Sequence, residues 1–125
     1  MRSKVVLQGI PSWECAGIYA LVDELGKVYI GSAVNLRKRL VAHNRGLYNA
    51  GRGVRDAFES QALQDAAAGG HAFQVSILAA FPSGISSQLL RQIEREFIAE
   101  YAERGPLYND RIQGRVSSAW KRRSL

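Results

Sequence analysis

The sequence contains only one cysteine, two histidines and three prolines, and it has no long hydrophobic run. The single cysteine, Cys15, cannot form an internal disulfide, and with two histidines it cannot complete an ordinary four-ligand zinc site. No stretch approaches the roughly 18 consecutive apolar residues of a membrane span, and the apolar run at residues 5–7 is too short for a signal peptide. These absences predict a cytoplasmic protein that does not act in a membrane.

Acidic residues are absent where basic residues gather. The window 35–55 has six basic residues and no acidic one, and the window 111–125 has five basic residues and again no acidic one. The rest of the chain carries 6 basic and 11 acidic residues, so the overall net charge of +6 conceals a net charge of −5 outside the two windows. Such clustering favours a nucleic-acid partner, and a solvated basic face that only aids solubility is the alternative. The residues expected to contact DNA are Arg37, Lys38, Arg45, Arg52, Arg55, Lys121, Arg122 and Arg123.

Three short segments have the composition of β-strands. Residues 17–22 (GIYALV) and 27–31 (KVYIG) are rich in β-branched and aromatic side chains, and the sequence Asp-Glu-Leu-Gly between them predicts a β-hairpin. In residues 73–80, Phe, Val and Ile alternate with Gln, Ser and Leu, which indicates a strand. Because the strands are few, helices must cover at least one face of the sheet.

Three helices are expected between and after these strands. The first spans 35–44, where Asn35 can cap the N-terminus and Gly46 is expected to end the helix. The second is expected over 54–68, and the third follows the Pro-Ser-Gly turn at 82–84, with Ser86 or Ser87 as its cap. A chain of 125 residues has no room for a second core of ordinary size, so the order β-β-α-α-β-α predicts one α/β (α+β) domain.

The last helix carries one carboxylate on its apolar side. At about 100° per residue, Glu94 projects between Ile98 and Tyr101, within the hydrophobic stripe. A carboxylate that faces the core is costly unless it is paired, protonated or bound to a metal. An ion pair with an arginine of this chain is the ordinary explanation, and a metal ligand is the functional one.

Several separated motifs follow one another in a familiar order. The sequence GIY at 17–19 and the sequence YIG at 29–31 resemble the signature of the GIY-YIG nuclease family. The later motifs of that family have counterparts here: Arg39 and His43 in the first helix, Glu94 in the last helix, and Asn109 after it. The resemblance spans residues 17–109, and the separate motifs make it far more specific than GIY alone.

The resemblance implies a small α/β sandwich in which helices flank a three-stranded, mostly antiparallel sheet. It implies hydrolysis of DNA phosphodiester bonds with one divalent cation, Mg²⁺ or Mn²⁺, as the cofactor. Glu94 would be the sole protein ligand of this metal, which suits Mg²⁺ because that ion keeps several waters. The implied nuclease domain covers residues 17–110, between an N-terminal extension (1–16) and a basic C-terminal tail (111–125).

The resemblance also implies catalytic roles. Tyr19 is the base or water-orienting group, with Tyr29 as its partner. A phenol with a pKa of ~10 is a poor base, but beside Arg39 and a metal-bound water its proton is expected to become easier to remove. Arg39 can also place a planar, permanently charged fork on the scissile phosphate. His43, four residues later, can orient a group or accept a proton.

Other residues of the site have supporting roles. Gly31 permits close approach of the backbone, and Asn109 is expected to brace the site by hydrogen bonding. Some family members have a second histidine or a lysine after the first helix. This chain has Tyr48, Arg52 and Arg55 there, so the second proton carrier stays open, and either arginine could stabilise charge.

Each assignment has a structural alternative. Without the motifs, Tyr19 and Tyr29 would be half-buried packing residues of two strands. His43 could be a satisfied interfacial histidine, and Arg39 could pair with a surface acid or contact phosphate nonspecifically. His71 is expected to have no chemical role.

The sequence thus predicts a metal-dependent DNA endonuclease with low intrinsic sequence specificity, located in the cytoplasm and associated with the nucleoid if the cell is prokaryotic. DNA repair and restriction are both compatible with this activity. The alternatives are a DNA-binding module without turnover, and a nuclease subunit directed by a partner protein or by homodimerisation. The presence of Tyr19, Tyr29, Arg39 and Glu94 argues against the inactive module.

Overall fold

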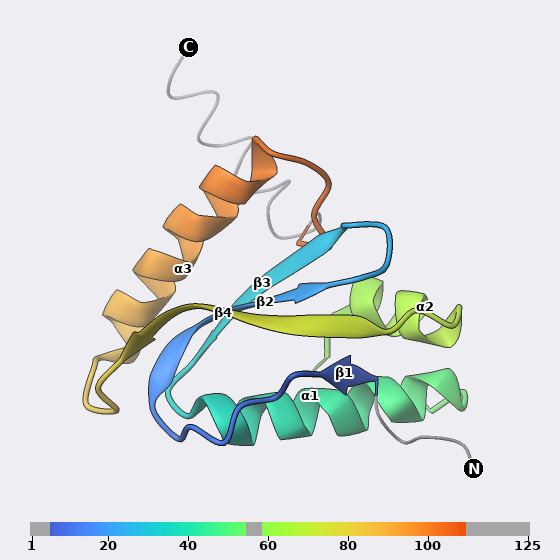
Figure 1. Ribbon diagram of the computed structural model, residues 1–125, viewed down its shortest axis with the longest axis horizontal. Helices are drawn as coiled ribbons and strands as arrows, with labels where there is room; N and C mark the ends of the chain where they lie inside the picture. The colour runs from blue at the N-terminus through green and yellow to red at the C-terminus, as the bar shows by residue number, and fades with distance from the viewer. Residues whose placement is uncertain (1–5, 55–58, 110–125) are drawn as a thin grey trace.

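The computed structural model describes residues 6–54 and 59–109, and these form a four-stranded sheet with three helices (Figure 1). The strands lie in the order β1-β4-β2-β3; β2 is antiparallel to both of its neighbours, and β1 is parallel to β4. None of the described helices is long and apolar enough to cross a membrane. Along the chain the elements are β1 (Leu7–Gln8), β2 (Ala16–Val22), β3 (Val28–Ala33), α1 (Leu36–Gly51), α2 (Gln61–Ala68), β4 (Phe73–Phe81) and α3 (Ser87–Ala102).

The α+β class is confirmed, but the predicted three-stranded sheet and its element order are wrong because β1 was missed. This strand has only two residues and therefore no hydrophobic period of its own. Both residues pair with 73–74 of β4, far away in the sequence. The side-chain oxygen of Asn44 in α1 also accepts hydrogen bonds from the backbone N–H groups of Val6 and Leu7, at 2.7 and 2.9 Å. Tertiary contacts alone create this strand.

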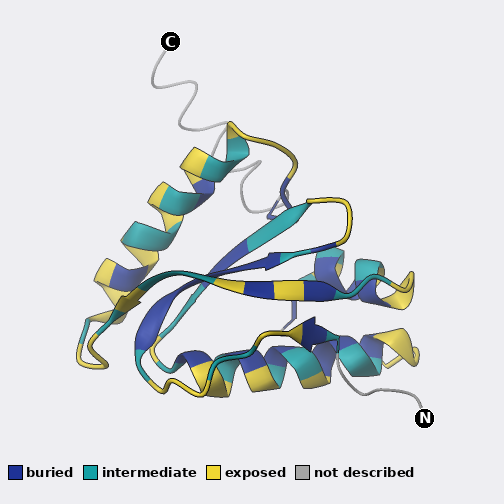
Figure 2. Ribbon diagram, viewed as in Figure 1, coloured by how far each residue is buried: buried dark blue, intermediate teal, exposed yellow. Residues whose placement is uncertain are grey.

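Helices cover both faces of the sheet (Figure 1). On one face, Tyr19 and Leu21 of β2 pack into a core shared with α1 and α2. On the other face, Ile18 and Ala20 pack against α3. Consecutive residues of a strand point to opposite faces, so one hydrophobic strand supplies both cores. Figure 2 shows the result: β2 is buried along most of its length, while the outer sides of the helices are exposed.

Helix α1 continues through Gly46, which was expected to end it, and reaches Gly51. Asn35 is the N-cap as predicted, and its side chain accepts a hydrogen bond from the backbone N–H of Lys38 at 3.0 Å. Gly46 is buried within the helix, where an added Cβ would lie 2.8 Å from Cγ of Glu59. This glycine therefore makes room for a neighbouring side chain, and residues 47–51, which lie beyond the predicted end, form the last part of the helix.

The remaining elements agree with the sequence more closely. Helix α2 starts at Gln61, later than the predicted start at Val54, because Ser60 is its N-cap and accepts a hydrogen bond from the backbone N–H of Leu63 at 3.3 Å. The predicted residues 55–58 lie outside the described part of the chain. Strand β4 was predicted to within one residue, and α3 begins after Ser86, one of the two serines expected to cap it.

A segment that follows α3 runs along the edge of β3. The N–H of Val28 donates to the carbonyl of Pro106, and the N–H of Tyr108 donates to the carbonyl of Val28. Two residues further along β3, the Asn109 side chain takes the place of a strand. Its oxygen accepts from the N–H of Ile30 at 2.9 Å, and its nitrogen donates to the carbonyl of Ile30 at 3.0 Å. These contacts fix the strand that carries the YIG sequence.

Gly17 of β2 has no space for a side chain, because an added Cβ would lie 2.4 Å from the carbonyl oxygen of Ala79 and 2.8 Å from Cδ1 of Leu36. Since the nearer atom belongs to the backbone, we expect Gly17→Ala to lower the free energy of unfolding by about 1–3 kcal/mol or more. Urea denaturation measures this change. Gly84→Ala is the matched control, because that glycine has open space around it, and it should change stability by less than about 0.5 kcal/mol. Equal effects of the two substitutions would contradict the prediction.

Candidate active site

Three buried polar side chains form a continuous hydrogen-bonded chain that connects the sheet with α1 and with the start of α2. The hydroxyl oxygen of Tyr19 on β2 lies 2.7 Å from Nε2 of His43 on α1. Nδ1 of the same ring lies 2.7 Å from Oε1 of Glu59, which immediately precedes the N-cap of α2. Both ring nitrogens therefore have polar partners, as buried polar groups require.

Arg39 and Tyr29 border this chain. Arg39, one helical turn before His43, places Nη1 3.8 Å from Oε2 of Glu59, and 37% of its side chain is exposed. The half-buried ring of Tyr29 packs edge-on against the imidazole, with the ring centroids 6.0 Å apart. The predicted residues Tyr19, Tyr29, Arg39 and His43 thus gather around one point.

Gly31 makes the contact between the sheet and His43 possible. It lies opposite Tyr19 in the register of β2 and β3. A Cβ at this position would lie 2.5 Å from both Cζ and the hydroxyl oxygen of Tyr19. The close approach expected at Gly31 is therefore made by the tyrosine ring, which crosses the glycine to reach the imidazole.

Burial makes both phenols hold their protons more strongly than in water. The pKa of Tyr19 is raised well above its usual value, first by burial and then by its interaction with Tyr29, while the charge and hydrogen bonding of Arg39 oppose the shift. Burial, followed by the charge of Glu94, raises the pKa of Tyr29 to about 12. Arg39 thus makes the Tyr19 proton easier to remove, as expected, but desolvation outweighs the nearby cation and the pKa of Tyr19 is raised overall.

Glu94 lies half-buried on α3, where Oγ of Ser32 on β3 donates a hydrogen bond to Oε1. Burial raises the pKa of Glu94, whereas the Ser32 hydrogen bond and the charges of Arg95 and Arg91 lower it. Within residues 6–54 and 59–109, no basic side chain comes within ion-pair distance of this carboxylate. The described part of the chain thus does not provide the arginine partner that would be the ordinary explanation for an inward-facing glutamate.

The carboxylate and the phenols approach each other around the edge strand β3. Tyr29 packs in the core that contains α1, whereas Ser32 holds Glu94 on the side covered by α3. Glu94 contributes to the raised pKa of both Tyr19 and Tyr29, so the three groups are close enough to interact electrostatically. Gly31, which has no side chain, lies between the two halves of the site.

The surroundings of Glu94 suit a divalent cation. A partly desolvated carboxylate with one oxygen held by a hydroxyl and no cationic partner among the described residues gains from a bound metal charge. Mg²⁺ and Mn²⁺ prefer oxygen ligands, and Mg²⁺ often takes only one or two carboxylates from the protein.

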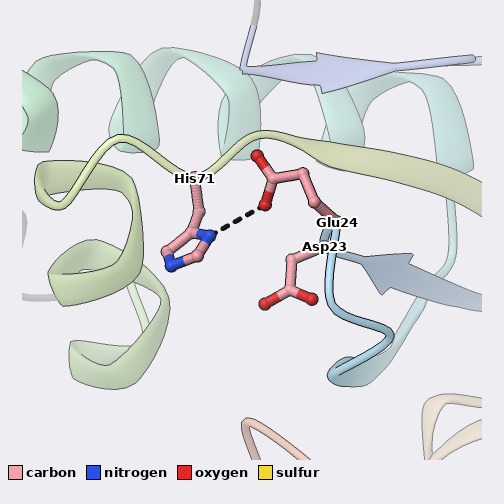
Figure 3. A group of neighbouring side chains, drawn as sticks. All are labelled: Asp23, Glu24 and His71. Atoms are coloured by element: carbon pink, nitrogen blue, oxygen red, sulfur yellow. Dashed lines mark hydrogen bonds and ion pairs between the residues drawn. The ribbon is translucent and has the colours of Figure 1, made fainter.

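A second group of potential metal ligands lies at the turn of the hairpin (Figure 3). Ligand atoms of Asp23, Glu24 and His71 lie within 4.8 Å of one another. Hydrogen bonds already engage these atoms: the hydroxyl of Tyr108 donates to Oδ2 of Asp23, and Nδ1 of His71 lies 2.8 Å from Oε1 of Glu24. Desolvation raises the pKa of Asp23, but hydrogen bonds from Tyr108 and two backbone N–H groups outweigh it and lower the pKa overall.

This group is separate from the site around Tyr19. Asp23 directly follows β2, four residues after Tyr19, which corresponds to about 13 Å at roughly 3.3 Å per residue. Its contacts join the hairpin to the loop before β4 and to the segment after α3. His71, expected to have no chemical role, makes a structural contact that the sequence did not predict.

Four of the basic residues predicted to bind DNA are exposed on α1 or at its C-terminal cap. They are Arg37, Lys38, Arg45 and Arg52, and the guanidinium of Arg52 lies 5.8 Å from the ring centroid of Tyr48. Arg55, Lys121, Arg122 and Arg123 lie outside the described residues, so their contribution remains a prediction.

Glu59 is the site residue that sequence reasoning missed. Its partner His43 is 16 residues away, and no short motif connects the two positions. The available signal was Gly46, because a glycine inside a helical pattern can mark close packing. Gly46 does not end the helix, and the Glu59 side chain packs against it.

The fold and the site together define the class of protein. The GIY and YIG strands are neighbours in one sheet, and the arginine, histidine and glutamate from two helices surround their tyrosines. The family model of the GIY-YIG catalytic domain matches residues 15–109 of this chain. The chain therefore belongs to the GIY-YIG nuclease family. Comparisons with curated proteins and with solved structures gave no match.

The raised pKa of Tyr29 predicts a pH-dependent contribution to stability. Tyrosine ionises near pH 10 in the unfolded chain but only near pH 12 in the folded protein. Between these values the folded state binds more protons, so the contribution is complete below pH 10 and is lost as the pH rises toward 12. We expect the unfolding free energy of the wild type, relative to Tyr29→Phe, to fall by up to about 1.4 kcal/mol per pH unit. Urea denaturation at a series of pH values measures this; a constant difference would contradict it.

Proposed function

We propose that this protein is a divalent-metal-dependent DNA endonuclease with low intrinsic sequence specificity. The observation that carries the proposal is that one site combines a half-buried carboxylate, a permanent cation and a phenol hydrogen-bonded to an imidazole. Phosphodiester hydrolysis needs an activated water and stabilisation of the negative charge that develops on the phosphate. The groups in this site are suited to both requirements.

Glu94 would hold Mg²⁺ or Mn²⁺, and Ser32 would orient its carboxylate through the hydrogen bond to Oε1. When bound, such an ion supplies Lewis-acid stabilisation to a phosphate oxygen and lowers the pKa of water. Among the described residues, no hydrogen bond or ion pair engages the second oxygen of Glu94, which leaves this oxygen available for a ligand.

Arg39 is suited to bind the scissile phosphate. Its guanidinium is partly exposed and keeps its charge at any physiological pH. The carboxylate of Glu59, 3.8 Å away, restrains the side chain without enclosing it. The planar guanidinium of Arg39, restrained by Glu59, can form two parallel hydrogen bonds with phosphate oxygens.

The two tyrosines and His43 are suited to handle the proton of the attacking water. Tyr29 is half-buried and therefore the more accessible phenol, whereas Tyr19 is buried and engaged with His43. We assign Tyr19 as the base or water-orienting group and Tyr29 as its partner. Tyr19 can act as a base only if its own proton passes to a neighbour, and Nε2 of His43 lies 2.7 Å away. Substrate binding must expose the Tyr19 oxygen to the water.

The exposed cations of α1 would contact the phosphate backbone. Contacts to phosphates carry little sequence information, whereas base-specific recognition needs side chains that reach the grooves. The bases of this chain's substrate would therefore have little influence on cleavage, which is the reason for proposing low specificity.

Removal of the metal ligand tests the proposal directly. We expect Glu94→Gln to reduce plasmid cleavage by at least about 10²-fold, because bound metal supplies several kcal/mol of transition-state stabilisation. EDTA should abolish wild-type cleavage, and Mg²⁺ or Mn²⁺ should restore it. Glu100→Gln, an exposed glutamate on the same helix, is the matched control and should cleave normally. Stable DNA binding without cleavage under any divalent metal would instead favour the DNA-binding module, and cleavage that requires another protein would favour a partner-directed subunit.

The exposed face of α1 predicts salt-dependent binding. Each cation that contacts a phosphate contributes close to one unit to the slope of log K against log salt concentration. We expect Lys38→Gln and Arg45→Gln each to lower this slope by about one unit in fluorescence-anisotropy titrations with duplex DNA. Arg104→Gln serves as the control, because Arg104 follows α3 and is already paired with Glu100. The same loss in all three variants would point to net charge and exclude a contact surface on α1.

A further inference from the structure

We propose that Glu59 is a positioning residue that fixes the protonation pattern of His43 and, through it, the direction of the Tyr19 hydroxyl. The kinetic part of this inference rests on the proposed nuclease function, whereas the structural part does not. Glu59, the residue before the N-cap of α2, would extend the Tyr19–His43 pair to a group of three residues.

Glu59 is held in one position by contacts on several sides. Only 3% of its side chain is exposed. Oε1 lies 2.7 Å from Nδ1 of His43, and Oε2 lies 3.8 Å from Nη1 of Arg39. Its methylene groups pack against Gly46, where an added Cβ would lie 2.8 Å from Cγ. A buried carboxylate with both oxygens directed at functional groups has little freedom to rotate.

This arrangement selects one tautomer of the imidazole. A carboxylate accepts hydrogen bonds, and Oε2 faces the permanent charge of Arg39, so Nδ1 of His43 carries the hydrogen that Oε1 accepts. In the neutral ring, Nε2 then has a lone pair and accepts a hydrogen bond from the Tyr19 hydroxyl. The phenolic hydrogen points to the imidazole, so the Tyr19 oxygen faces the site as an acceptor, and Arg39 already donates to it.

The opposite tautomer would work against the proposed reaction. With hydrogen on Nε2, the imidazole would donate to the Tyr19 oxygen and occupy one of its lone pairs. The phenol would then have no acceptor at its own hydrogen. Glu59 therefore decides whether Tyr19 presents an acceptor or a donor to the site.

The same contacts give a balanced path for one proton. As water attacks the phosphate, its proton passes to the Tyr19 oxygen, and the original phenolic proton passes to Nε2 of His43. The phenol is neutral before and after the step, and the positive charge that appears on the imidazole faces the negative carboxylate of Glu59. This path avoids a free phenolate, which the raised pKa of Tyr19 makes costly.

Nitrogen NMR of the full-length protein tests the tautomer without any substrate. The chain has two histidines, so a His71→Gln background leaves His43 as the only source of imidazole signals. Each protein is labelled with ¹⁵N-histidine, and two-bond correlations distinguish protonated from unprotonated ring nitrogens. We expect hydrogen on Nδ1 and a lone pair on Nε2. Glu59→Gln should mix the two tautomers or reverse them, because an amide can donate as well as accept. Glu59→Asp, which keeps the carboxylate, should restore the original pattern.

Cleavage kinetics on the same variants test the functional consequence. We expect Glu59→Gln to lower kcat about 10- to 100-fold, the range typical of residues that orient a reactive ligand, with KM for DNA little changed. Glu59→Asp should recover part of the rate, and Glu100→Gln should match the wild type. If Glu59→Gln fails to fold, Glu59→Asp and the wild-type tautomer still decide the question.

Three results would overturn the proposal. The first is hydrogen on Nε2 in the wild type. The second is a Glu59→Gln variant with an unchanged tautomer and an unchanged rate. The third is a loss of rate with the tautomer unchanged, which would limit Glu59 to restraining Arg39. If the wild type cleaves no DNA at all, the proposed function fails, but the NMR measurement still establishes or refutes the effect of Glu59 on His43.

Discussion

A buried chain of hydrogen bonds from Tyr19 through His43 to Glu59 connects the sheet with both helices on one of its faces. Polar groups removed from water destabilise a fold unless each one has a partner. Strand β2, helix α1 and the start of α2 must therefore be placed so that all these contacts form together. This requirement explains why two positions are glycine. Gly31 lets the Tyr19 ring reach the imidazole, and Gly46 leaves space for the Glu59 side chain.

The same burial determines the electrostatic character of the site. Desolvation raises the pKa of both tyrosines and of Glu94, and the arginines nearby only reduce this effect. The free protein thus favours protonated phenols. A bound cation would favour the ionised form of Glu94, so metal binding and proton release are coupled in such a site. In the proposed reaction, the acceptor next to Tyr19 therefore matters more than the intrinsic basicity of the phenol.

The site also depends on how β3 is held, because the phenols and Glu94 approach each other around this strand. At the hairpin turn, Asp23 binds the hydroxyl of Tyr108, and Glu24 contacts His71. Nearer the site, Asn109 binds both backbone polar groups of Ile30. Asn109 is thus a brace, as the sequence suggested, and the segment after α3 fixes the strand from which Tyr29 and Gly31 reach the site.

The sequence by itself determined the local elements and much of the site. Local preferences of the chain are strong over a few residues. They determine the turn of the hairpin, the helix caps Asn35 and Ser86, and the helical spacing that places Arg39 one turn before His43. The inward direction of Glu94 could likewise be inferred from the helical period alone. Strand β1 is a different case, because its pairing depends on β4 and on Asn44.

The tertiary structure alone decided how these local pieces interact. It extended α1 through Gly46, brought Glu59 to His43, and buried Tyr19 so deeply that its pKa rose despite the nearby Arg39. Each result depends on desolvation and packing between segments that are distant in the sequence. The sequence therefore identified the family of the chain and most of the side chains that gather in the candidate site, while the fold shifted the pKa values of these groups by deciding which of them lost contact with water.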